Sequence, residues 1–152
     1  MSSETRSAAV ILMAEDDDDD FMLVEKAFKK ARLDVLLHRV TDGESLLDYL
    51  TNRGNYKNVT RFPSPDIILL DLNMPRKDGR EALRELKSEE QFQKIPVLVF
   101  TTSESDDDIG RSYGLGGNSF IRKPVTFEEL VEIVKIIHAY WFGIVSLPKE
   151  KA

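Results

Sequence analysis

The sequence predicts an α/β fold in which one parallel sheet carries helices on both faces. Short apolar runs alternate five times with segments whose apolar residues recur at helical spacing. The run at residues 67–70, Ile-Ile-Leu-Leu, is apolar at every position, as in a central strand buried on both faces. A chain of 152 residues is long enough for a single domain with one closed core. We therefore expect a doubly wound parallel sheet built from five βα units.

Each element is expected where an apolar pattern is bounded by charged or turn-forming residues. The strands are expected at residues 10–14, 35–40, 67–70, 97–101 and 119–124. The helices are expected from within the acidic run to about residue 31, at 44–50, 80–87 and 106–113, and after a Thr126-to-Glu129 capping box. Residues 51–64 contain glycine, asparagine and proline and predict a long loop. We expect residues 1–9 to be flexible, residues 10–142 to form the domain and residues 143–152 to form a tail.

Composition and charge exclude several classes of protein. The net charge of -6 disfavours a nucleic-acid surface, which needs a basic face. The absence of cysteine excludes disulfides and thiolate sites. No apolar run approaches the roughly 20 residues of a membrane span, and the polar start does not resemble a signal peptide. We expect a soluble, cytoplasmic protein that binds neither nucleic acid nor membrane.

Polar side chains stand at the carboxyl ends of four of the five expected strands. Glu15 and Asp16 follow the first strand, Asp71 the third, Thr101 ends the fourth, and Lys123 lies at the end of the fifth. Parallel strands end at one edge of a sheet, so these side chains should converge. Carboxylates without imidazole or thiolate suit Mg²⁺ or Mn²⁺. An aspartate beside such a cation can be a nucleophile towards a phosphoryl group, with the lysine and the threonine as donors.

These residues resemble the response-regulator receiver domain. The resemblance covers about residues 10–141 and also rests on Leu72-Asn73-Met74-Pro75, Asp78-Gly79 and Lys123-Pro124. It implies a flavodoxin-like fold with strand order 2-1-3-4-5. It also implies that a partner histidine kinase phosphorylates Asp71, so that the protein is a phosphoacceptor and not an enzyme.

The same resemblance implies the ligands of the cation. Asp16 and Asp71 would bind Mg²⁺ directly, Glu15 through a water molecule, and Asn73 through its backbone carbonyl group.

The resemblance further implies how phosphorylation is transmitted. Thr101 and Lys123 would bind the phosphoryl oxygens, and their movement would carry the signal. The bond between Lys123 and Pro124 would be cis, as is usual in the family. The aromatic switch position on the fifth strand corresponds to Phe120, which can rotate inward as tyrosine does but has no hydroxyl group to donate.

A narrower resemblance concerns the loop at 51–64 and the tail at 140–148, which are similar to those of stand-alone regulators paired with bacterial phytochrome kinases. The last helix also has two adjacent apolar stripes, wider together than packing on its own sheet requires. The stripes are Leu130, Val134, Ile137 and Trp141, and Ile133, Ile136, Tyr140 and Ile144. We expect a homodimer through this helix and the tail.

Simpler interpretations apply to the remaining acidic residues. Residues 17–20 are expected only to favour a helix N-terminus through its dipole. A calcium loop starting at Asp16 is disfavoured because Phe21 stands where such a loop needs glycine. Residues 106–108 are expected only to cap and solvate the fourth helix.

Three other functions are disfavoured by residues of this chain. An aspartyl-phosphate hydrolase typically has a second acid two residues after its nucleophile, where this chain has Asn73. A flavin carrier of the same fold needs a phosphate-binding loop where this chain has six consecutive acids. A constitutive scaffold, a receiver that has lost its chemistry, is disfavoured by the complete set of acids.

Overall fold

The computed structural model describes residues 8–103 and 105–148. Most of the segment expected to be flexible, residues 1–7, lies outside the described residues, as do residues 149–152 of the expected tail. Ala9, which was assigned to the flexible segment, is instead the first residue of a strand.

Five parallel strands form one sheet in the order β2-β1-β3-β4-β5, which confirms the predicted topology. Their bounds are β1 Ala9–Ala14, β2 Val35–Val40, β3 Ile67–Leu70, β4 Val97–Thr101 and β5 Ser119–Arg122. All four residues of β3 are buried. Burying a leucine or isoleucine side chain contributes about 1.5–3 kcal/mol to the stability of the fold. The buried strand β3 therefore holds Asp71, the residue that follows it, in a fixed position.

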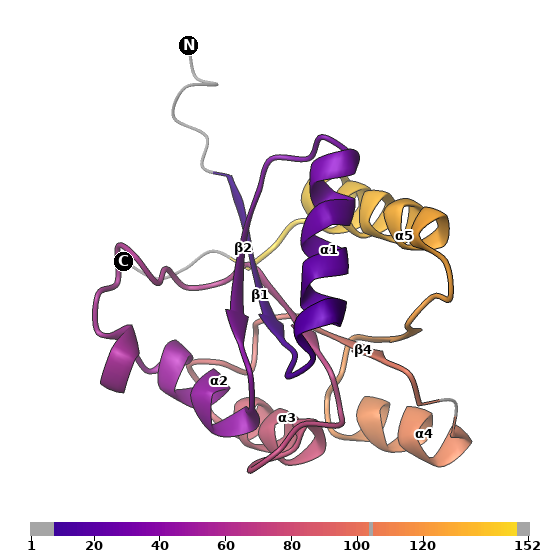
Figure 1. The fold of residues 1–152 in the computed structure, drawn as a ribbon. Coiled ribbons are helices and arrows are strands. Elements are labelled where there is room, and N and C mark those ends of the chain that lie inside the picture. Colours follow the sequence, from indigo (N-terminus) through magenta and orange to yellow (C-terminus); the bar gives the residue numbers. More distant parts are fainter. Residues whose placement is uncertain (1–7, 104, 149–152) are drawn as a thin grey trace.

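Helices cover both faces of the sheet (Figure 1). Their bounds are α1 Asp18–Lys30, α2 Gly43–Leu50, α3 Gly79–Ser88, α4 Asp106–Gly114 and α5 Phe127–Ala139. Helices α1 and α5 pack together in one apolar cluster, while α2 and α3 pack in a second cluster on the opposite face. Each expected helix is therefore present, with bounds that differ from the prediction by one or two residues.

A polar side chain caps the N-terminus of every one of these five helices. The caps are Asp17, Asp42, Asp78, Ser105 and Thr126, and each accepts a hydrogen bond from a backbone N–H in the first turn. These caps fix where each helix starts, and Asp17, the cap of α1, also lines the cleft at the carboxyl edge of the sheet.

Two features lie outside the regular βα pattern. The loop at 51–64 contains one 3₁₀ turn, η2 Gly54–Tyr56, and is held down because the hydroxyl of Tyr49 donates to the carbonyl of Pro63 at 2.8 Å. After α5 the chain continues as a π-helical turn, η3 Tyr140–Ile144. Within the described ranges, no helix is long and apolar enough to cross a bilayer.

Candidate functional site

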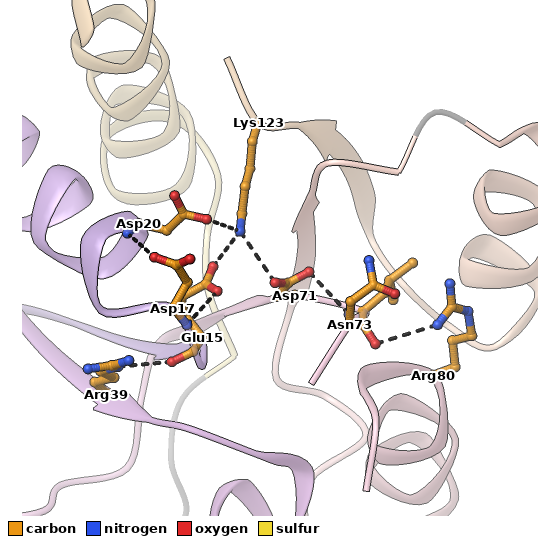
Figure 2. A network of polar contacts seen from close by, with 9 residues as sticks. Glu15, Asp17, Asp20, Arg39, Asp71, Asn73, Arg80 and Lys123 are labelled. Carbon is orange, nitrogen blue, oxygen red and sulfur yellow. Dashed lines mark hydrogen bonds and ion pairs between the residues drawn. The ribbon is translucent and has the colours of Figure 1, made fainter. Parts of the chain in front are cut away.

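Glu15 and Asp71, two of the side chains expected at the carboxyl edge of the sheet, meet around Lys123 (Figure 2). Its ammonium group lies 2.6 Å from a carboxylate oxygen of Glu15 and 3.3 Å from one of Asp71. Glu15 follows β1, Asp71 follows β3 and Lys123 follows β5, so three separate strands supply the contacts. Glu15 and Asp71 are buried, and the lysine side chain is only 10% exposed.

Three carboxylates are close enough to share one ion. Oxygen atoms of Glu15, Asp16 and Asp71 lie within 4.8 Å of one another, and Asp16 is the exposed member. They border an open cleft of about 660 Å³ that is lined by polar and charged residues. Hard oxygen donors in this number suit Mg²⁺ or Mn²⁺, with waters completing the coordination. The donor set therefore fits the cation expected from the sequence.

Opposing effects set the ionisation of the central groups. Burial raises the pKa of the Glu15 carboxyl to about 7, helped by the nearby charge of Asp71 and opposed by the hydrogen bond from Lys123. Burial acts to lower the pKa of Lys123, but hydrogen bonds to Asp20 and Glu15 outweigh it, and this pKa is raised. The lysine therefore stays protonated. The carboxylates of the site outnumber its single ammonium group, and this excess of negative charge favours binding of a divalent metal.

The backbone around Asp71 is fixed by close contacts. The Asp71 N–H donates to the carbonyl of Ala14 at 3.1 Å, and the Asn73 N–H donates to the Asp71 carboxylate at 3.2 Å. Gly79 begins α3 directly against this segment, and a Cβ atom there would collide with the carbonyl oxygen of Asp71. The Asp78-Gly79 pair is thus needed for close packing as well as for a turn.

Thr101 lies at the end of β4, but its hydroxyl group does not line the cleft; the neighbouring Thr102 does. The Thr101 hydroxyl is buried and has no hydrogen-bond partner within the part of the chain that the structure describes. A buried unpaired hydroxyl is costly, and an anionic oxygen reaching it would supply the missing partner.

The acidic run takes a larger part in the site than the sequence predicted. Asp17 caps α1, as expected. Asp20 was expected only to favour the helix dipole, but its carboxylate lies 2.8 Å from the Lys123 ammonium, so that expectation is incomplete. Arg39 of β2 donates to the Glu15 carbonyl at 2.9 Å and pairs with Asp18 at 2.8 Å, which fixes the start of α1. The only signal in the sequence was that Asp20 lies one turn beyond the strand-end acids.

The expectation that residues 106–108 only cap and solvate α4 is also wrong for Asp108. Its carboxylate accepts two hydrogen bonds from Arg80 of α3, at 2.8 and 3.0 Å, and one from Ser103 at 2.6 Å. The cap of α4 is instead Ser105.

Two expectations about β5 have different outcomes. The prediction of a cis bond between Lys123 and Pro124 is wrong, because the described chain has no cis peptide bond. The lysine reaches Glu15 with the bond in its lower-energy trans form. Phe120 is half-buried against the cluster on the α2 and α3 face, and its role as a switch stays a prediction.

Comparison with known proteins decides the family. The model of the response regulator receiver domain matches residues 11–135. The chain belongs to the response-regulator receiver family. The response regulator Rcp1 of Synechocystis sp. is 39% identical over 148 residues, which cover 97% of this chain and 99% of Rcp1. Receiver domains are normally non-enzymatic phosphoacceptors in two-component signalling, and this chain is a response regulator.

Solved structures agree with this assignment. The response regulator RPA3017, described in red light signaling of R. palustris, has a TM-score of 0.88 at 36% identity and is covered over 99% of its length, with 93% of this chain. The phosphorylated cyanobacterial phytochrome response regulator RcpA has a TM-score of 0.86 at 38% identity, with 94% of this chain and 100% of RcpA covered. The Mn²⁺-bound form of Rcp1 has a TM-score of 0.82 at 39% identity, with 93% of this chain and 99% of Rcp1 covered. Receiver domains bind a divalent metal, and the acids gathered here are compatible with that.

Proposed function

We propose that Asp71 accepts a phosphoryl group from the phosphohistidine of a histidine kinase. One observation carries this proposal: the Asp71 carboxylate lies within reach of both the Lys123 ammonium and the two other acids that could share a cation. Glu15, Asp16, Asp71 and the backbone carbonyl of Asn73 would hold Mg²⁺ or Mn²⁺. When bound, the cation would offset the charge on the phosphoryl oxygens.

The reaction follows from the groups already in place. A carboxylate oxygen of Asp71 attacks phosphorus, the P–N bond of the donor breaks, and the histidine leaves with its bonding electron pair and takes up a proton. Lys123 donates to a phosphoryl oxygen and stabilises the charge that develops. The buried hydroxyl of Thr101 gains an acceptor for its hydrogen bond.

The signal would begin with that hydroxyl group. Phosphorylation adds up to about two negative charges and three acceptor oxygens beside β4. Movement of Thr101 towards them would leave room for Phe120 to turn further inward. Because phenylalanine has no hydroxyl group, packing alone would hold the rotated ring.

For the partner, we propose a phytochrome-type histidine kinase acting in the cytoplasm. The support is that RcpA is a phytochrome response regulator and that RPA3017 is described in red light signaling. Both match this chain over more than nine-tenths of its length. A net charge of -6 supports a protein partner over nucleic acid.

We also propose a homodimer formed through α5 and the tail. The stripe that faces the sheet is buried at Leu130, Val134 and Ile137. The second stripe leaves Ile136 at 65% and Ile144 at 72% exposure. Large apolar side chains gathered along one helix favour a second protein surface over water. A species with the mass of one protomer at tens of micromolar, measured by sedimentation, would refute the dimer.

Labelling with a small phosphodonor tests the central proposal. Incubation of the protein with Mg²⁺ and acetyl phosphate should add one phosphoryl group by intact mass, and Asp71→Asn should abolish the addition while the circular dichroism spectrum is retained. The control is Asp107→Asn, which removes an exposed acid outside the cleft lining and should label normally. Equal labelling of the Asp71→Asn variant would place the phosphoacceptor elsewhere.

A further inference from the structure

The ammonium group of Lys123 has three carboxylate partners, and the one from outside the strand ends is Asp20 of α1 (Figure 2). The distances are 2.6 Å to Glu15, 2.8 Å to Asp20 and 3.3 Å to Asp71. An ammonium has three donor hydrogens, so these acids can occupy all of them. The lysine is therefore held closer to the two acids on the β1–α1 side than to the phosphoacceptor.

The three acids differ in what else they can do. Glu15 and Asp71 belong to the group of carboxylates that can share a metal ion with Asp16, and Asp20 does not. A divalent ion would draw Glu15 and Asp71 towards itself and weaken their hold on the lysine. Asp20 is outside that group and would not be drawn towards the metal, and its side chain is 37% exposed. We therefore expect its ion pair with Lys123 to persist when the metal binds.

We propose that Asp20 is a positioning residue that competes with the phosphorylated Asp71 for Lys123 and so weakens retention of the phosphoryl group. The inference rests on the proposed function. For the ammonium to approach the phosphoryl oxygens, the pair with Asp20 must be stretched or shared, and the stability it gives to the unphosphorylated state is lost.

The ion pair between Asp20 and Lys123 also links two separate elements of the fold. Asp20 lies in the first turn of α1, and Lys123 lies in the connection between β5 and α5. The pair therefore joins the start of α1 to the segment that leads into α5, the helix of the proposed dimer surface. Withdrawal of the lysine towards Asp71 removes this tie at the moment of phosphorylation.

Binding of beryllofluoride, which mimics the phosphoryl group, tests the competition without turnover. At saturating Mg²⁺ the Asp20→Asn variant should bind beryllofluoride about threefold more tightly than the parent protein, as loss of a partly exposed ion pair predicts. Loss of the phosphoryl group after labelling should slow by a similar factor. The matched control is Asp19→Asn, which removes the same charge from the same turn and the same cleft wall. The side chain of Asp19 makes no hydrogen bond or ion pair with the described residues, so its variant should bind like the parent.

A second background separates an effect through Lys123 from a general effect of charge. In a Lys123→Ala protein, Asp20→Asn should no longer change the affinity for beryllofluoride. In the parent protein, Asp20→Glu keeps the carboxylate and should leave the affinity unchanged. Unchanged or weaker binding by Asp20→Asn would overturn the proposal, as would an equal gain in Asp19→Asn or a gain that persists without the lysine. Failure of the parent protein itself to bind beryllofluoride or to label would refute the proposed function instead.

Discussion

The guanidinium group of Arg80 forms two hydrogen bonds with the carboxylate of Asp108 and joins the first turn of α3 to the first turn of α4. Another donor of the same guanidinium points to the carbonyl of Leu72, the residue after the phosphoacceptor, at 3.5 Å. Ser103, two residues after Thr101, donates a hydrogen bond to the carboxylate of Asp108. This bridge thus connects both strand ends beside the site with the helix that follows β4.

Substitution of Asp108 by asparagine should lower the free energy of unfolding by about 1 kcal/mol at pH 7, since a paired, two-pronged ion pair is lost. The hydrogen bond from Arg80 lowers the pKa of Asp108 below its usual value. The difference in the free energy of unfolding between the parent and the variant should therefore be largest above about pH 4. It should disappear as the pH falls through the lowered pKa of Asp108. Urea unfolding of both proteins across this range measures it. The exposed neighbour, in Asp107→Asn, should show no such pH-dependent difference.

The parts of the fold that the sequence could predict are those set by local pattern. The all-apolar run of β3 and the strand-end acids were sufficient to place Glu15, Asp71 and Lys123 together, because parallel strands share one edge. The pair between Asp20 and Lys123 could not be predicted, because it depends on the rotation of α1 about its axis. That rotation is set by tertiary packing, because α1 lies in one apolar cluster with both the sheet and α5.

Gly79 should not tolerate alanine, despite the better helix propensity of alanine. The added Cβ would meet the backbone of Asp71, which cannot move without displacing the phosphoacceptor. We expect a loss of about 1–3 kcal/mol in stability and weaker phosphorylation. The control is Gly110→Ala in α4, where a Cβ would meet nothing within 4 Å. That change should raise stability by up to about 1 kcal/mol. Urea unfolding compares the two, and equal effects would contradict the close-approach explanation.

Thr101→Val should change stability and ligand binding in opposite directions. Valine has the same shape but removes a buried hydroxyl that lacks a partner among the described residues, so the unligated protein should gain about 1 kcal/mol. Binding of beryllofluoride with Mg²⁺ should weaken, because the donor to the phosphoryl mimic is lost. Chemical unfolding with and without the ligand gives both numbers. Thr102→Val, at the exposed neighbour, should change stability by less than about 0.5 kcal/mol. A loss of stability in Thr101→Val would show that its hydroxyl is satisfied in the free protein.

Mg²⁺ alone should stabilise the protein, because it binds the carboxylates gathered in the folded state. At a tenfold excess over the dissociation constant the gain is about 1.4 kcal/mol, and a chelator should reverse it. Asp16→Asn should remove most of this gain, since it deletes the exposed member of the three-carboxylate group. Asp19→Asn, a change of equal charge outside that group, should retain it. Thermal unfolding with a Mg²⁺ titration measures the effect, and equal metal responses in the two variants would show that Asp16 is not a ligand.

Ile136→Glu should separate dimer formation from folding. Ile136 is 65% exposed in the single chain, so a polar replacement should change the stability of the protomer by less than about 0.5 kcal/mol. Burial of an isoleucine in an interface is worth about 1.5–3 kcal/mol, so its loss should raise the dimer dissociation constant at least about tenfold. The control is Val59→Glu, which places the same charge on a side chain that is 62% exposed in the loop at 51–64. Sedimentation velocity over a concentration series should show a monomer for Ile136→Glu under conditions where the parent and the control remain dimeric. A dimer of undiminished affinity in Ile136→Glu would remove the exposed stripe of α5 from the interface.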